Sequence, residues 1–180
     1  DWPLAVPVGL SGDSAGIAAF KAQLATPPTN RNGERVTTVA LTGVTALVRA
    51  TAYAMEQNGL LWPGEEVREV LRSADIAHIS NEVAFVPDCP YPNPIGGTTF
   101  CSDSRYFELL EDIGTDVMEL TGNHVNDYGA DNFAASIAQY EAAGMQVYGG
   151  GIDATVAEAP AVFEHNGNRI VFHGCNSFGP

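Results

Sequence analysis

The stretch DVMELTGNHVNDYGADNFAASIAQYEAAGMQVYGG, residues 116–150, decides the fold class. Residues 116–120 are mostly apolar and β-prone, and residues 132–144 have the spacing of an amphipathic helix. A second short β-prone segment follows over 145–150. The stretch therefore predicts a strand, a helix and a strand, which is the unit that joins two parallel strands of one sheet.

The same alternation extends in both directions along the chain. Strands are predicted over 35–41 and 75–80, and helices over 46–57, 63–74 and 105–114. We expect Gly43 to end the first strand, and Ser102 or Ser104 to cap the helix that Gly114 ends. Two further strands within 161–175 are joined by Asn166-Gly167, a strong signal for a type I′ hairpin turn. The predicted fold is α/β, with a mostly parallel sheet, flanking helices and a C-terminal hairpin.

Residues 1–34 differ in pattern from the rest of the chain. They contain one short helical candidate, 15–24, and end in a segment rich in Pro, Asn and Gly. We expect an N-terminal arm or a linker from a preceding module here, followed by the α/β domain over 35–180. The chain begins at Asp1, and we expect it to be a processed product.

Composition limits the classes of function. The chain has 180 residues and a net charge of −14, from 22 acidic and 8 basic residues. So few cations cannot neutralise a row of phosphates, which argues against nucleic acid as a partner. The apolar segment 36–55 contains Arg49 and several threonines, so we do not expect it to span a membrane.

Three cysteines lie at 89, 101 and 175. The loop CPYPNPIGGTTFC between the first two is too rich in Pro and Gly for regular structure. We predict a Cys89–Cys101 disulfide, worth roughly 3 kcal/mol through its effect on the unfolded chain. A disulfide favours an exported protein, and the alternative is two free thiols. We expect the partner of Cys175 to lie beyond Pro180.

Polar residues follow three of the predicted strands, at 42–44, 80–82 and 121–124. The carboxyl ends of neighbouring parallel strands form the ligand crevice of such sheets, so we expect these segments to converge. Glu82, Asn123 and His124 offer oxygen and nitrogen donors suited to Mn, Fe or Zn. The alternative is a tight turn in which the Asn of GNH and the Asp of DYG, Asn123 and Asp127, cap the next helix.

The other three histidines are interpreted as structural. His78 falls within a predicted strand, His165 lies beside the hairpin, and His173 falls on the last predicted strand. A histidine in such a position more often forms a hydrogen bond within the fold than it binds a ligand.

Three segments together resemble the CapA-type poly-γ-glutamate capsule biosynthesis proteins, which have a calcineurin-like metallophosphoesterase fold. The segments are LRSADIAHISNEVAF (71–85), LLEDIGTDVMELTGNHVNDYGADNFAASIAQYEAAGMQVYGGG (109–151) and PAVFEHNGNRIVFHGC (160–175). The resemblance runs from about Arg35 to the end and implies half of a metallophosphatase-like α/β sandwich, the N-terminal half of that domain. It also implies an exported protein of the capsule or cell envelope.

The resemblance assigns roles to individual residues. Glu82, with Asn81 beside it, and Asn123 would be ligands of a divalent metal (Mn, Fe or Zn) in the full-length protein. His124 would protonate a leaving group or stabilise developing negative charge. Asp127 would orient His124 or cap the helix. Catalysis would thus rest on His124 and Asp127.

Two departures from the family pattern affect these roles. The family has Gly-Asp after the first strand, whereas this chain has Gly43-Val44, and valine cannot bind a cation. The late histidines of the family site are absent from the sequence. We therefore expect no complete metal centre in this chain, which would need the missing C-terminal half of the domain.

Two hypotheses follow. The parent protein is a metal-dependent hydrolase acting on poly-γ-glutamate or a related envelope polymer, or it is a non-catalytic module that binds such an anionic polymer or a protein partner. An incomplete sandwich would expose a sheet edge and an apolar flank, so we also expect self-association.

Overall fold

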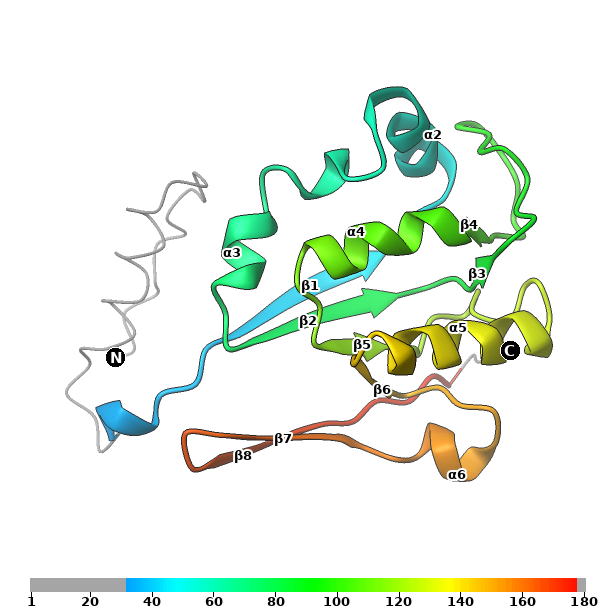
Figure 1. The fold of residues 1–180 in the computed structure, drawn as a ribbon. Coiled ribbons are helices and arrows are strands. Elements are labelled where there is room, and N and C mark those ends of the chain that lie inside the picture. Colours follow the sequence, from blue (N-terminus) through cyan, green and yellow to red (C-terminus); the bar gives the residue numbers. More distant parts are fainter. Residues whose placement is uncertain (1–31, 178–180) are drawn as a thin grey trace, which may run out of the picture.

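The computed structural model describes residues 32–177, whose centre is a four-stranded parallel sheet (Figure 1). The strand order is β1-β2-β5-β6, and every neighbouring pair is parallel. The strands are β1 (Val39–Thr45), β2 (Ile76–Asn81), β5 (Val117–Glu119) and β6 (Gln146–Tyr148). The predicted mostly parallel α/β sheet is confirmed. The helix expected over 15–24 lies outside the described residues.

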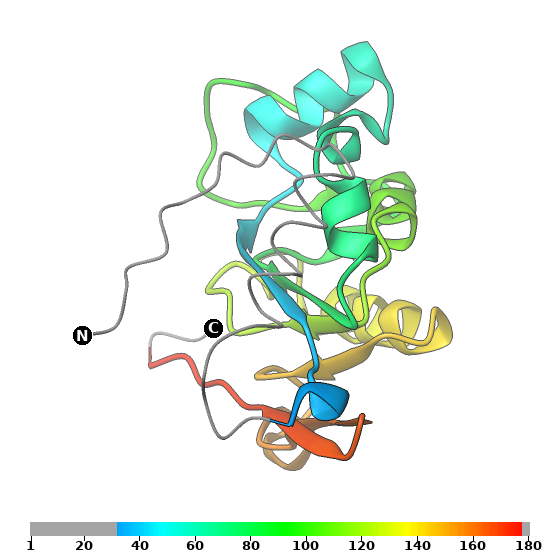
Figure 2. The same cartoon turned by 90° about the vertical axis from the view of Figure 1, so that its left-hand side faces the viewer.

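Helices cover one face of this sheet, as the side view in Figure 2 shows. They are α2 (Arg49–Asn58), α3 (Arg68–Arg72), α4 (Phe107–Asp112) and α5 (Ala130–Ala142). Three 3₁₀ turns, a one-turn helix and a two-stranded parallel ladder complete this part: η1 (Gly33–Arg35), η2 (Trp62–Gly64), η3 (Ser104–Tyr106), α6 (Ala154–Ala157), β3 (Phe85–Val86) and β4 (Ser102–Asp103).

Alternate residues of the central strands enter two separate cores. Ala77, Ile79 and Met118 pack with the helices in the larger core. Ile76 and Val117 enter a smaller cluster with aromatic residues of the C-terminal hairpin. Because both faces are covered, every residue of β2 is buried, as expected for an inner parallel strand.

The hairpin consists of β7 (Ala161–His165) and β8 (Asn168–Phe172), paired antiparallel. Asn166 and Gly167 both have positive φ, 50° and 72°, as a type I′ turn requires. The predicted hairpin and its turn are therefore confirmed.

Two local predictions of element bounds were wrong. The first strand begins at Val39 and runs through Gly43 to Thr45, because the register shifts by one residue between Leu41 and Val44 and this extra residue forms a β-bulge. The segment 63–74 forms η2 and the short α3 instead of one helix. A Cβ at Gly64 would lie 2.9 Å from Leu109 and Ile113 side-chain carbons, so contact with α4 decides this turn.

The helix over 105–114 is confirmed, but its predicted cap is wrong. Asp103 caps η3, with its side chain accepting the Arg105 N–H, and α4 continues from that turn. Ser102 is instead buried and donates its hydroxyl hydrogen to the carbonyl of Leu47. Gly114, with φ 74°, follows the helix as predicted.

Candidate functional site

The carboxyl ends of β1, β2 and β5 lie side by side, as the sequence predicted. Thr45 is paired with Asn81 at the end of β1 and β2, and Ser80 is paired with Glu119 of β5. Glu82 then donates its backbone N–H to the carbonyl of Thr45 over 3.2 Å. The ends of β1 and β2 and the segment 121–124 after β5 therefore lie at the same end of the sheet, with residues 42–44 inside β1.

The loops after β2 and β5 are in direct backbone contact. Val83 and His124 form an isolated parallel bridge. A Cβ added at Gly122 would lie 2.5 Å from the Cα of Glu82, so only glycine allows this approach. The close approach fixes the backbone of Glu82 beside that of the Asn123–His124 segment.

His124 and Asp127 form the best-defined polar pair of this edge. The imidazole Nδ1 lies 2.7 Å from Oδ2 of Asp127, and both side chains are about one-fifth exposed, 22% and 19%. The same carboxylate oxygen accepts the backbone N–H of Phe100 at 2.7 Å. The carboxylate thus orients the imidazole, and Nε2 of His124 makes no hydrogen bond within the described part of the chain.

The segment forms a tight turn, but the predicted capping of the following helix by Asn123 and Asp127 is wrong. Helix α5 begins after Gly129, with φ 89°, and no side chain caps it. Asp127 is occupied by His124 and Phe100, and Oδ1 of Asn126 is buried without a hydrogen-bond partner among the described residues. The turn therefore holds polar side chains that its own helix does not use.

The predicted metal ligands differ in their availability. Glu82 is half-buried and Asn123 is exposed, and neither side chain makes a hydrogen bond or ion pair within residues 32–177. Asn81 is only 2% exposed, and its amide donates to the carbonyl of Val83 and to the hydroxyl of Tyr140. Asn81 is a core residue and is not available to a cation.

Val44, which the resemblance aligns with an aspartate, is 68% exposed near the end of β1. Over residues 32–177, no group of three or more His, Cys, Asp or Glu side chains is arranged to hold a metal ion. The assignment of Glu82, Asn123 and His124 as metal donors stays a prediction.

His78 and His165 lie away from the candidate site. His78 is buried, with Nε2 2.7 Å from the Tyr148 hydroxyl, and its ring stacks on Phe172. His165 bonds Thr37 near the hairpin turn. His173 follows the last residue of β8, rather than lying within the last strand as predicted.

The predicted Cys89–Cys101 disulfide is present, with the two Cα atoms 5.9 Å apart, and Cys175 is free and exposed. The loop closed by the Cys89–Cys101 disulfide reaches the candidate site through Phe100. The ring of Phe100 lies 4.5 Å from the His124 ring, edge to face, and Arg49 lies 4.4 Å above the centroid of Phe100. Sequence reasoning missed Phe100 and Arg49, because their contacts join segments far apart in the chain.

The chain was compared with known protein families. The profile of the family described as bacterial capsule synthesis protein PGA_cap matches residues 38–179. The chain belongs to this family, which confirms the resemblance drawn from the sequence. A comparison with curated proteins found no match. None of the described helices is long and apolar enough to cross a membrane.

Proposed function

We propose that the protein binds and processes poly-γ-glutamate or a related anionic capsule polymer at the cell envelope. The site is formed by Glu82, Asn123, His124 and Asp127. Membership of the capsule synthesis family supports the polymer class. The main support for the site is the 2.7 Å contact between His124 and Asp127, at the end of the sheet where three parallel strands finish.

The pair suits proton transfer. Asp127 holds one ring nitrogen of His124, so the other nitrogen is free to give a proton to a leaving amine or to take one from water. Asn123, exposed beside it, offers an amide donor to a carbonyl oxygen of the polymer. In this proposal His124 is the catalytic residue and Asp127 positions it.

A second candidate is a non-catalytic module that binds the same polymer or a protein partner. The exposed Val44 and the incomplete donor set favour this alternative, because hydrolysis by a metal-activated water needs more ligands than the described residues provide. Export is part of both proposals and is supported by the disulfide, which persists in oxidising compartments.

One experiment distinguishes the polymer-processing enzyme from the non-catalytic binding module. The chain is mixed with poly-γ-glutamate of defined length, with and without Mn²⁺ or Zn²⁺, while binding is followed by calorimetry and polymer length by size-exclusion chromatography. The first candidate predicts binding and shortening, with shortening abolished in His124→Gln. Binding without shortening supports the module instead. No binding of the polymer would contradict the first candidate and leave only a protein partner for the second.

Calorimetric titration with the metals alone belongs to the same experiment. Because the donor set is partial, we expect no tight Mn²⁺ or Zn²⁺ binding by residues 1–180. Tight binding that is lost in Glu82→Gln or Asn123→Ala would contradict this expectation and would assign a metal to the site.

A further inference from the structure

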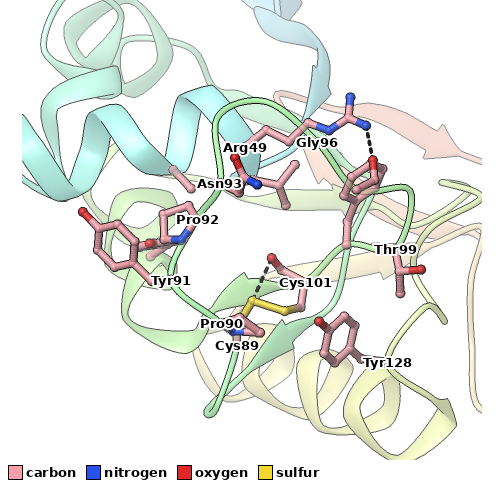
Figure 3. Close-up of a pocket in the computed structure, with 15 residues that line it drawn as sticks. Arg49, Cys89, Pro90, Tyr91, Pro92, Asn93, Gly96, Thr99, Cys101 and Tyr128 are labelled. Carbon is pink, nitrogen blue, oxygen red and sulfur yellow. Dashed lines mark hydrogen bonds between the residues drawn. A yellow bond between two sulfur atoms is a disulfide. The ribbon is translucent and has the colours of Figure 1, made fainter.

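A pocket lies beside the candidate site, between the disulfide loop and the first turn of α2 (Figure 3). Its volume is about 190 Å³. The residues that line the pocket include Arg49, Tyr91, Asn93, Phe100 and Tyr128.

The walls of the pocket are held by contacts outside it. The Cys89–Cys101 disulfide closes the loop at its base. The Tyr91 hydroxyl accepts a hydrogen bond from Gln57 at 3.1 Å, and its ring packs edge to face on Tyr53. The pocket is therefore formed before a ligand arrives, so little ordering of the loop would oppose binding.

Arg49 gives the rim of the pocket a positive charge. Its guanidinium donates to the carbonyl of Gly97 and lies over the ring of Phe100, so most of its N–H groups have no acceptor. Within residues 32–177, Arg49 forms no ion pair. Four other arginines of that range do form ion pairs: Arg68, Arg72, Arg105 and Arg169.

A cation without a carboxylate partner is notable in a chain of net charge −14. Acidic residues outnumber basic ones 22 to 8, and yet none of those in the described range pairs with Arg49. A carboxylate brought by a ligand would complete the guanidinium with charge-assisted hydrogen bonds. The aromatic side chains below it offer apolar surface to a methylene chain.

We propose that this pocket binds one glutamyl unit of the capsule polymer, with its carboxylate on Arg49 and its methylene groups against Tyr91 and Tyr128. The inference rests on the function proposed above and adds a binding subsite to it. Pockets that enclose a whole small ligand measure about 300 Å³ or more. A volume of about 190 Å³ suits a single unit of a chain that continues outside.

The subsite is connected to the candidate catalytic pair. Phe100 lines the pocket, and its ring also contacts the ring of His124, with 4.5 Å between the two centroids. Its backbone N–H is bonded to Asp127. A glutamyl unit held by Arg49 therefore places a neighbouring unit of the polymer near His124, and the subsite positions the bond to be cleaved.

The test is titration of the chain with a fluorescently labelled γ-linked glutamate oligomer at low salt, followed by anisotropy. We expect Arg49→Gln to weaken binding about tenfold or more, because a charge-assisted hydrogen bond is lost. The control is Arg169→Gln, which removes the same charge from the exposed hairpin, paired there with Glu164. We expect the control to stay within about twofold of the unsubstituted chain.

A second pair of variants leaves Arg49 in place. Asn93 accepts the N–H of Ile95, and Asn32 accepts the N–H of Glu34, each at 3.0 Å and two residues ahead. Aspartate preserves either bond, so Asn93→Asp adds a negative charge to the pocket without disturbing the loop, and Asn32→Asp adds one elsewhere. We expect only Asn93→Asp to weaken binding strongly.

The outcomes separate the subsite from the proposed function. Oligomer binding that is weakened by Arg49→Gln and Asn93→Asp supports the subsite. Binding that these variants leave unchanged, but that His124→Gln weakens, overturns the subsite and keeps the proposed function. No binding of the oligomer by the unsubstituted chain overturns both.

Discussion

His78 and His124 form similar short contacts in different surroundings. Each has one ring nitrogen 2.7 Å from a side-chain oxygen. For His78 the partner is the hydroxyl of Tyr148, and for His124 it is the carboxylate of Asp127. The Tyr148 hydroxyl can donate to or accept from the ring of His78, whereas the Asp127 carboxylate only accepts and so orients the ring of His124.

Burial separates the two histidines further. His78 is 7% exposed and stacks on Phe172, and burial lowers its pKa, although Glu119 opposes this effect. Burial likewise raises the pKa of Tyr148 to about 12, so the hydroxyl keeps its proton. His124 is partly open to solvent, and its Nε2 has no partner within the described residues.

The different surroundings of His78 and His124 follow from their positions relative to the ends of the strands. His78 lies in the middle of β2, where the hairpin covers it. His124 lies just past the end of β5, where the parallel strands leave a free edge. The second position lies beyond the carboxyl ends of the strands, where ligand sites of open α/β sheets are found.

The largest expected effect comes from removing the disulfide, which holds the loop that packs on His124 and not on His78. Cys89→Ser with Cys101→Ser should lower the free energy of unfolding by about 3 kcal/mol, because the unfolded chain is no longer constrained. Phe100, next to Cys101, then loses its fixed place against His124. Chemical denaturation measures the loss, and imidazole NMR signals report on each histidine.

Cys175→Ser is the matched control for this variant, because Cys175 is free and exposed. We expect it to change stability by less than about 0.5 kcal/mol. Equal shifts of the NMR signals of both histidines in the double serine variant would contradict this prediction, because the loop would then not act on His124 alone.

A smaller effect is expected in the pH dependence of stability. The folded pKa of His78 lies below its ordinary value of 6.5, so above that pH the residue is neutral in both states. As pH falls below 6.5, the unfolded state takes up protons that the folded state does not, and the free energy of unfolding falls. His78→Gln lacks this contribution.

The advantage of the unsubstituted chain over His78→Gln should therefore shrink between pH 7.5 and pH 5.5. Urea denaturation of both proteins over this range measures it. An advantage that grows on acidification would contradict the lowered pKa of His78 and its assignment as a buried structural residue.

Much of the fold was predictable because its signals are local. The alternation of strands and helices, the Asn166-Gly167 turn and the spacing of the first two cysteines each depend on residues close in sequence. The end of β1 at Thr45 was not, because a bulge restores pairing with β2 after Gly43. Likewise, Gly64 packs against residues more than forty positions away, and no local pattern reports that contact.

The candidate site was predictable to the same extent. Glu82, Asn123 and His124 follow strands, and parallel topology alone brings their backbones together. The state of each side chain depends on long-range contacts: Asn81 is held by Tyr140, and Asp127 is shared with Phe100. The pocket of Arg49 depends on the disulfide loop folding back over α2, which no motif in the sequence indicates.

The most direct test of the account compares the two histidines in polymer binding. The affinity of folded His124→Gln and folded His78→Gln for poly-γ-glutamate is measured by calorimetry beside the unsubstituted chain. We predict at least about tenfold weaker binding for His124→Gln, because its imidazole lies in the proposed polymer site, and near-unchanged affinity for His78→Gln. Equal affinity in all three, or a loss confined to His78→Gln, would contradict a polymer site at the end of β5.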